Sequence, residues 1–292
     1  MTVIELIERM SARLLEAGVS FGHGTNNAFD EAAWLVLWQL KLPLDALDDS
    51  AAQLVDSAGQ DAVAQLIQTR IQTRRPAAYL TGEAWLQGIA FHVDERVIVP
   101  RSLIAEPLAD GTLDVWLAAD PRRVLDLCTG SGSLAVLAAL AWPEAVVEAT
   151  DISADALAVA ALNVARHQLG QRQRQRQRIT LRQGDGLAAA QGRYELILCN
   201  PPYVNRQSMA ALPAEYMAEP QLALDGGSDG MDFIRRLLAG VSHHMTDDAV
   251  LVLEIGHERP HFDAAFPRLN VIWLPTSAGD DQVLLIQRQS LQ

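Results

Sequence analysis

The spacing of apolar and polar residues divides this 292-residue chain into two differently built parts. Up to about residue 84, apolar residues recur every three or four positions, which is the period of an amphipathic helix. From Arg122 onward, short runs rich in β-branched residues alternate with alanine-rich stretches of helical period. We therefore expect a small helical domain followed by a domain in which strands and helices alternate.

Three stretches of the first part have helical spacing, and we expect Pro43 and Gly59 to interrupt it. The next segment alternates apolar and polar residues around Asp94 and Glu95, which predicts a β-hairpin linker with its turn there. The three predicted helices cover 1–18, 31–45 and 61–74. The predicted division of the chain is a helical domain at 1–84, a hairpin linker at 85–102 and a strand-helix domain at 103–292.

The second part predicts an α/β fold built on a mostly parallel sheet. Strands that alternate with helices are joined by right-handed crossovers, which place helices on both faces of the sheet. The last two strands are separated only by PTSAGDD, which is too short for a crossover, so we expect them to pair antiparallel. The predicted strands are 122–127, 145–150, 179–182, 194–199, 249–255, 270–274 and 282–287, and the clear helices are 133–142, 153–168 and 231–245.

Composition narrows the class of protein. With 49% hydrophobic and 20% charged residues the chain reads as globular, and 23 basic against 36 acidic residues give a net charge of −13. This charge argues against a protein that coats nucleic acid and favours a basic protein partner. Cys128 and Cys199 are the only cysteines, so neither a disulfide framework nor a cysteine metal site is expected. No apolar run reaches membrane-spanning length, and we expect a cytoplasmic location.

The repeat QRQRQRQR at 171–178 is the one low-complexity segment. Its arginines are typical either of a nucleic-acid patch or of a solvated insertion. The repeat lies between a predicted helix and the next strand, at the amino edge of the sheet, whereas ligands in such folds bind at the carboxyl edge. Its position therefore favours the solvated insertion.

A glycine-rich turn follows the first strand of the second part, in VLDLCTGSGSLAVLAAL. Gly130 and Gly132 allow close approach to the backbone, and the next helix offers unpaired amides at its start. This arrangement is typical of a nucleotide-cofactor site, but alone it is a weak signal. The loose dinucleotide pattern is also satisfied, so enzymes that transfer hydride remain an alternative at this point.

Two carboxylates follow the next two strands. Asp151 is placed to accept hydrogen bonds from ribose hydroxyls, although it or Ser153 is equally suited to cap the following helix. Asp185 is placed to accept a bond from an adenine amine, and a plain turn residue is nearly as common there. Together with Asp126 and the glycines, both fall at the carboxyl ends of successive strands, which capping alone does not explain.

The stretch ILCNPPYV at 197–204 ends another predicted strand in an unusual way. Pro201 and Pro202 cannot donate to a sheet, so the strand stops before them. The residue before a proline is driven to extended geometry, which restricts Asn200 as well. The turn presents the side-chain amide of Asn200, backbone carbonyls with no neighbouring N–H donor and the ring of Tyr203. It lies at the carboxyl edge of the predicted sheet, as do Asp151 and Asp185.

These motifs resemble a known class of enzymes. DLCTGSG, Asp151, Asp185 and NPPY together look like the S-adenosylmethionine-dependent methyltransferases that act on planar nitrogen. The N-terminal helical domain and FHVDERVIVPR narrow the resemblance to the protein-glutamine methyltransferases, which modify release factors or a ribosomal protein. The resemblance covers nearly the whole chain and implies the Rossmann-like, seven-stranded class I methyltransferase fold.

Within that family, several phrases resemble the branch that methylates a glutamine of large-subunit ribosomal protein L-three. Enzymes of the release-factor branch usually have a proline and an acidic pair after the Pro-Arg of the hairpin, where this chain has Ser102 and Leu103. Two departures from the ribosomal branch are Leu103, where a proline is frequent, and Gly186-Leu187, which lacks the aromatic residue that commonly packs on adenine. The phrases are GHGTNNAFDEAAWLVLWQLKLPLD, VPRSLIAEPLADG and NPPYVNRQSMAALPAEYMAEPQLALDGGSDGMD.

The resemblance implies S-adenosylmethionine as cofactor, no metal, and a substrate-recognition role for the helical domain. The side-chain oxygen of Asn200 and the carbonyl of Pro201 are expected to accept the two hydrogens of the substrate amide. Pro202 brings no competing donor, and Tyr203 is expected to lie against the flat amide. The expected cofactor-binding residues are Asp126, Thr129, Gly130, Gly132, Asp151, Ile152, Asp185, Gly186 and Asn200.

The expected partner is ribosomal protein L-three, before or during ribosome assembly, with no membrane and no sequence-specific nucleic acid. Three alternatives stay open. Release factors are one alternative substrate. An adenine amine of DNA or RNA suits the same motif but requires a basic recognition region, and outside the short repeat none is visible. A non-catalytic assembly factor is expected to lack Asn200 or the glycines, and both are present.

Overall fold

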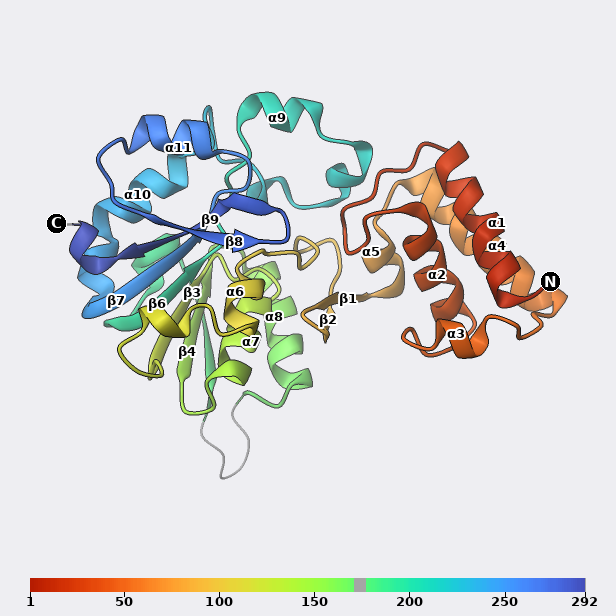
Figure 1. Cartoon of the computed structure of the whole chain (residues 1–292), viewed down its shortest axis with the longest axis horizontal. Helices are drawn as coiled ribbons and strands as arrows, with labels where there is room; N and C mark the ends of the chain where they lie inside the picture. Colours follow the sequence, from red (N-terminus) through yellow and green to blue (C-terminus); the bar gives the residue numbers. More distant parts are fainter. Residues whose placement is uncertain (171–176, 292) are drawn as a thin grey trace.

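The computed structural model describes residues 1–170 and 177–291. They form a helical N-terminal lobe and a larger lobe built on a sheet, with a two-stranded hairpin between them (Figure 1). The helices of the N-terminal lobe are α1 (Val3–Glu16), α2 (Ala28–Gln39), α3 (Leu47–Ser50), α4 (Ser57–Thr73) and α5 (Ala77–Thr81).

The predicted helices of the N-terminal lobe are confirmed, and their amphipathic faces meet in a core of their own that includes Leu6, Leu35 and Ile67. The prediction that Gly59 breaks a helix is wrong. Gly59 lies in the first turn of α4, because the carboxylate of Asp56 accepts its backbone N–H at 2.7 Å and caps the helix two residues earlier. Pro43 does lie between helices, as expected.

The linker contains the predicted hairpin, formed by β1 (Glu83–Leu86) and β2 (Ile89–His92). The expected turn at Asp94 and Glu95 is wrong, because the chain reverses at Gln87 and Gly88, with φ of 49° and 72°. Positive φ at both central positions is the pattern of a type I′ two-residue loop, which suits Gly88. The carboxylate of Asp94 instead accepts bonds from the backbone and side chain of Arg96.

The large sheet has the seven strands that the sequence predicts, in the order β5-β4-β3-β6-β7-β9-β8. β9 runs antiparallel to both β7 and β8, so the expected antiparallel pair at the end of the chain is confirmed, and the other pairs are parallel. The strands are β3 (Arg123–Leu127), β4 (Val146–Asp151), β5 (Ile179–Gln183), β6 (Tyr194–Cys199), β7 (Met245–Glu254), β8 (Ile272–Thr276) and β9 (Gly279–Gln287).

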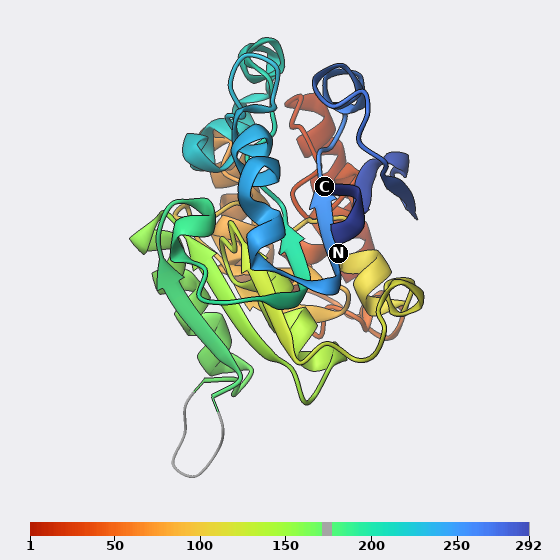
Figure 2. The same ribbon diagram turned by 90° about the vertical axis from the view of Figure 1, so that its left-hand side faces the viewer.

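Helices cover both faces of this sheet (Figures 1 and 2). Successive strand residues alternate between the two apolar cores, so that Val124 packs with α7 and α8 whereas Leu125 packs with α10. The predicted helix at 231–245 ends earlier as an α-helix and continues as a 3-10 turn, Val241–His244. The helices are α6 (Ala105–Ala109), α7 (Ser133–Ala141), α8 (Ala154–Arg166), α9 (Arg206–Ala211), α10 (Asp232–Gly240) and α11 (Arg259–Ala265).

The strand order reverses between β3 and β6. β3 is followed along the chain by β4 and β5 on one side, whereas β6 and β7 are added on the other. Crevices at the carboxyl ends of strands beside such a reversal are where open α/β sheets bind ligands. The glycine turn follows β3 and Asn200 follows β6, so both candidate motifs lie at this point.

Most of the glutamine-arginine repeat, residues 171–176, lies outside the described residues, so neither interpretation of it is tested there. Arg178 is described, and its guanidinium donates to the carbonyls of Ala139, Trp142 and Ala145 around the end of α7. This last arginine of the repeat therefore holds a helix end.

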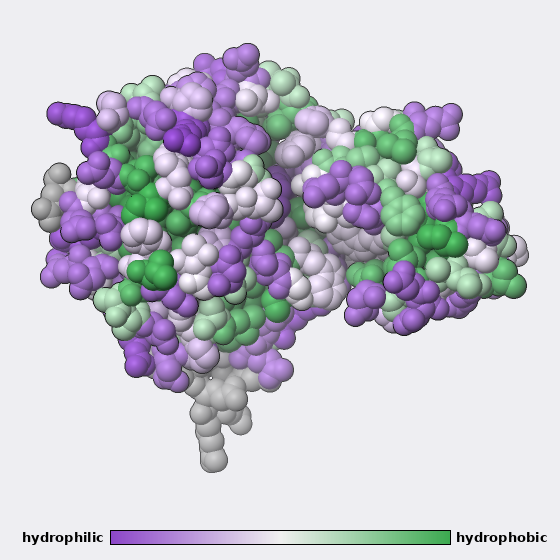
Figure 3. Space-filling model, in the orientation of Figure 1, coloured by the Kyte–Doolittle hydropathy of each residue, from purple (hydrophilic) through white to green (hydrophobic). Residues whose placement is uncertain are grey.

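The face of the molecule in Figure 3 mixes hydrophilic and hydrophobic residues over both lobes. None of the helices in the described ranges is long and apolar enough to cross a membrane.

A buried ion cluster joins the two lobes. Arg70 of α4 is fully buried, and its guanidinium donates to Glu31 of α2 at 2.8 Å and to Glu215 at 3.3 Å. Glu215 belongs to the segment that follows α9, which reaches the helical lobe in Figure 1. Burial raises the pKa of Glu31, and the charge and hydrogen bond of Arg70 are the main effects that oppose this rise.

Replacing this buried guanidinium is therefore expected to destabilise the protein strongly. Arg70→Met leaves buried Glu31 without its only ion-pair partner among the described residues and takes from Glu215 one of two, the other being Arg74. We expect this change to lower the free energy of unfolding by about 3 kcal/mol. The control is Arg122→Met, whose ion pair with Glu144 is exposed and 3.8 Å long, with an expected loss below about 0.5 kcal/mol. Urea unfolding followed by circular dichroism measures both, and equal losses in the two variants contradict the prediction.

Candidate active site

The glycine turn after β3 is held from below by a buried carboxylate. Asp126 is fully buried and accepts bonds from the Thr129 hydroxyl and from the Ala135 N–H at 3.0 Å. Burial raises the pKa of Asp126 to about 7, against the effect of these two donors. Above this support Gly130 has φ of 54°, in the left-handed region that glycine adopts without strain.

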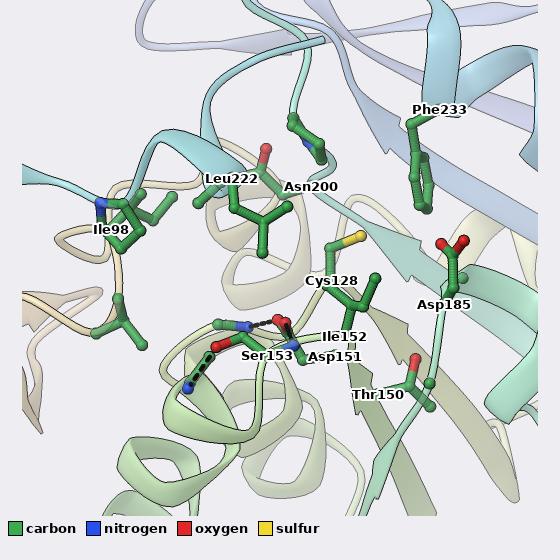
Figure 4. A pocket seen from close by; sticks show the side chains of 18 of the residues that line it. Ile98, Cys128, Thr150, Asp151, Ile152, Ser153, Asp185, Asn200, Leu222 and Phe233 are labelled. Atoms are coloured by element: carbon green, nitrogen blue, oxygen red, sulfur yellow. Dashed lines mark hydrogen bonds between the residues drawn. The ribbon is translucent and has the colours of Figure 1, made fainter.

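A first cavity of about 280 Å3 opens above this turn, at the carboxyl ends of β3, β4, β5 and β6 (Figure 4). Asp151 ends β4 and accepts the N–H groups of Gly130 and Ser153, both at 2.9 Å. Burial raises the pKa of Asp151, although these bonds act in the opposite direction. The helix cap is Ser153, which accepts the Ala156 N–H, so the capping alternative belongs to that residue.

The first cavity brings together most of the residues that the sequence singles out. Asp126 and Thr129 do not line it, because they lie beneath the turn. Gly132 does not line it either, since a Cβ there would approach Ala160 of α8 at 3.1 Å. The singled-out residues that do line it are Gly130, Asp151, Ile152, Asp185, Gly186, Asn200 and Pro202.

The carboxylate of Asp185 is only partly free to bind an adenine amine. This group is about half exposed and pairs with Arg236 of α10 at 3.1 Å. Beside it, Gly186 faces the ring of Phe233, which a Cβ on the glycine would meet at 3.5 Å. Phe233 lines the cavity and points toward Asp185 in Figure 4. An aromatic face is therefore present where Gly186-Leu187 lacks one, supplied by a different element.

Several lining residues were missed by sequence reasoning. Phe233 gave no local signal, because its place opposite Gly186 depends on how α10 packs on the sheet. Ile98 of the linker also lines the cavity. The alternation of apolar and polar residues predicted a hairpin in the linker but not the position of that hairpin relative to the sheet. The position of the linker is explained by Asn163 of α8. The side chain of Asn163 accepts the N–H of His92 and donates to the carbonyls of His92 and Ser131, which ties the hairpin to the glycine turn.

A second cavity, of about 620 Å3, lies on the other side of the NPPY corner. Pro201 and Tyr203 line this second cavity, whereas Pro202 lines the first. Asn200 lines both cavities, together with Ile98 and Ala223. No hydrogen bond ties its side-chain amide to another residue in the described ranges, so the amide is available to a bound molecule at the junction.

The second cavity is bounded by parts from both lobes. Gly22 and Asn26 come from the helical lobe, and Arg101 comes from the linker. Arg101 binds the buried Glu219 with both nitrogens, and Glu219 also accepts the Val99 N–H at 2.9 Å. Burial by itself raises the pKa of Glu219, but Arg101 and His23 bring it down to about 2.

Two residues of the loop before α2, His23 and Asn27, make different contacts. His23 is buried beside Glu219 at 3.5 Å and contacts the ring of Tyr216, with ring centroids 4.4 Å apart. Asn27 accepts the Asp30 N–H at 2.9 Å and so caps α2. Within residues 1–170 and 177–291, the histidines, cysteines and carboxylates form no group of three or more that could hold a metal ion.

Comparisons with known proteins agree with this arrangement. Residues 112–227 match the methyltransferase small domain family. The chain is 54% identical over 296 residues to the ribosomal protein uL3 glutamine methyltransferase of Bordetella pertussis, covering 99% of this chain and 96% of that protein. It is 44% identical over 292 residues to the protein of the same name from Neisseria gonorrhoeae, covering 99% and 95%.

One solved structure supports the fold alone. The catalytic domain of hMettl16, solved in complex with MAT2A 3'UTR hairpin 6, has a TM-score of 0.50 and 12% sequence identity to this chain. The similarity covers 79% of this chain and 81% of that one. The Rossmann-like fold expected from the sequence is thus confirmed. The hydride-transfer alternative is set aside by the methyltransferase relatives and family model.

The relatives also test the resemblance to the ribosomal branch. Identities of 54%, 50% and 44% extend over 99% of the chain, so they include the helical lobe and the linker as well as the sheet. The protein-glutamine methyltransferase family expected from the sequence is confirmed. The chain therefore belongs to the family of ribosomal protein uL3 glutamine methyltransferases.

Proposed function

We propose that this protein transfers a methyl group from S-adenosylmethionine to the side-chain amide nitrogen of a glutamine in ribosomal protein uL3, the L-three protein of the large subunit. The observation that carries the proposal is the position of Asn200, which lines both cavities at their junction. From this junction the side-chain oxygen of Asn200 can hold a substrate amide in the second cavity against the methyl group of a cofactor bound in the first cavity. The names of the full-length relatives supply the identity of the protein substrate.

The first cavity is the proposed cofactor site. Asp151 accepts the ribose hydroxyls there, and Gly130 lets the chain approach the cofactor closely. Asp185 accepts the adenine amine, while Ile152 and Phe233 offer apolar faces to the base. Asp126, Thr129 and Gly132 act indirectly by supporting the turn and the start of α7.

The second cavity is the proposed glutamine site. An amide nitrogen is a weak nucleophile, because its lone pair is shared with the carbonyl. The side-chain oxygen of Asn200 and the carbonyl of Pro201 each accept one amide hydrogen, which aims the nitrogen at the methyl group and favours the positive charge that develops on it. S-adenosylmethionine supplies the methyl group: a C–N bond forms as the C–S bond breaks, and the proton then leaves to water.

The partner assignment adds two finer points. A basic ribosomal protein suits a chain with net charge −13. A glutamine must enter the second cavity on a length of chain that passes between the lobes, so the substrate is uL3 before or during ribosome assembly, in the cytoplasm. No direct contact with a specific nucleic-acid sequence is part of this proposal.

The test is to incubate the pure protein with methyl-labelled S-adenosylmethionine and free uL3, assembled large subunits or release factors, and then to locate the label. We expect label on one glutamine of free uL3 and far less on assembled subunits. Label on release factors alone contradicts the proposed substrate, and label on an adenine amine contradicts the proposed chemistry.

Removing the amide at the junction is expected to separate turnover from cofactor binding. Asn200→Ala loses one of the two acceptors aimed at the reacting nitrogen, so we expect kcat to fall by at least about 100-fold. The Kd for S-adenosylmethionine, measured by calorimetry, is expected to stay within about twofold of the wild-type value. Asn270→Ala, at an exposed position outside both cavities, serves as control, and full activity in Asn200→Ala would overturn the assignment.

Removing the aromatic ring of Phe233 is expected to weaken cofactor binding. Stacking of a base on an aromatic ring contributes about 1–3 kcal/mol, so Phe233→Ala is expected to weaken binding of S-adenosylhomocysteine and of adenosine by about tenfold. The control is Leu237→Ala, which removes a buried side chain one turn later on α10, away from the cavity. Calorimetry measures both variants, and equal effects in the two would show that packing of α10, not contact with the base, is responsible.

A further inference from the structure

Three glycines make room for Tyr203. A Cβ on Gly256 would lie 2.5 Å from Cε2 of the tyrosine ring, and one on Gly226 would lie 2.7 Å from its Cα. A Cβ on Gly230 would overlap its carbonyl oxygen. These distances are well below van der Waals contact, so two segments, the loop before α10 and the turn after β7, close around Tyr203 at positions that admit no side chain. Gly226 and Gly230 thus pack against the backbone of Tyr203 and Gly256 against its ring, which lies at the edge of the second cavity.

The phenol of Tyr203 is bound to a buried carboxylate. Its hydroxyl donates to Oε1 of Glu254 at 3.0 Å. Glu254 is the last residue of β7 and is almost completely buried. Its other oxygen, Oε2, accepts the hydroxyl of Ser102 at 2.6 Å and the N–H of Leu103 at 2.9 Å. One carboxylate thus joins the NPPY corner, the end of the linker and the end of β7.

Burial raises the pKa of both partners of this hydrogen bond. Burial raises the pKa of Tyr203 well above its usual value, so the phenol stays neutral and remains a donor. Burial also raises the pKa of Glu254, and the Ser102, Tyr203 and Leu103 donors oppose that effect, with a further contribution from Arg101. Its donors come from Tyr203, Ser102 and Leu103, and the residue itself lies at the wall of the second cavity.

We propose that Glu254 is a positioning residue for methyl transfer. Its carboxylate fixes the orientation of the Tyr203 ring through the phenol, and ties that ring to the linker through Ser102 and Leu103. This inference rests on the proposed function, in which the ring lies against the substrate amide. Under it, the tyrosine hydroxyl serves the enzyme's own geometry and does not act on the glutamine. A ring that tilts leaves the nitrogen less well aimed at the methyl group, which slows the reaction.

The chain contains a matched pair for control experiments. Tyr194, at the start of β6, donates its hydroxyl to Glu148 at 2.8 Å, and both residues are buried. This pair has the same chemistry as Tyr203 and Glu254 but lies at the opposite end of β6, outside both cavities. Removing the hydrogen bond between Tyr194 and Glu148 measures how much a buried bond of this kind contributes to stability where it has no part in the reaction.

The test is a double-mutant cycle on methylation of uL3 with Tyr203→Phe, Glu254→Gln and the double variant. Each single change is expected to lower kcat by about tenfold while the Kd for S-adenosylmethionine stays within about twofold. The double variant is expected to be no slower than the slower single variant, because both changes act on the same hydrogen bond, which Tyr203→Phe removes and Glu254→Gln weakens. Tyr194→Phe is expected to lower the melting temperature as Tyr203→Phe does, with wild-type kcat.

Losses that multiply in the double variant overturn the proposal, and so does wild-type kcat in Tyr203→Phe. If Glu254→Gln does not fold, Ser102→Ala takes its place in the cycle, with a smaller loss that again must not add to that of Tyr203→Phe. Failure of the wild-type protein to methylate uL3 is a different result, which overturns the proposed function and not the coupling between Glu254 and Tyr203.

Discussion

The parallel pairing of β3 with β6 is the constraint on which the site depends. Its register sets Leu127 opposite Cys199, so the two strands end side by side and the chain leaves them as the glycine turn and as Asn200. Two prolines then prevent β6 from continuing, which keeps Asn200 at the edge of the sheet. A shift of this register by one residue would reverse which face each side chain occupies and would separate the two motifs.

Buried charge holds the surrounding parts in place around that edge. Glu219 binds the linker through Arg101 and Val99, whereas Glu215 binds Arg70 of the helical lobe. Both glutamates belong to the segment that follows NPPY, so the second cavity is closed by contacts from all three parts of the chain. Such pairs contribute little net stability when formed and cost much when broken, which suits a role in fixing relative position.

The sequence predicted the fold well because each of its signals was local or periodic. All seven strands and the antiparallel last pair followed from apolar runs and loop lengths, and the order of Asp151, Asp185 and Asn200 along the chain placed them at one edge. Three things did not follow. The hairpin turn at Gln87 and Gly88 was masked by a stronger polar pair downstream. Phe233 reaches the site only through the packing of α10, and the bond between Tyr203 and Glu254 likewise depends on tertiary packing.

The ionisable groups around Asn200 argue for catalysis by placement. The pKa of Tyr203 is raised by burial, which leaves the phenol neutral, and that of Cys199 is raised as well, which leaves a thiol. Burial raises the pKa of Glu254 against the effect of its donors, and both its oxygens already accept hydrogen bonds from the protein. A base is not required in any case, since the amide becomes strongly acidic only once it carries the methyl group. Under the proposed function, the fold supplies two hydrogen-bond acceptors and a fixed aromatic ring to the substrate amide. The two prolines, the three glycines around Tyr203 and the buried carboxylate of Glu254 each restrict a different motion of the NPPY corner.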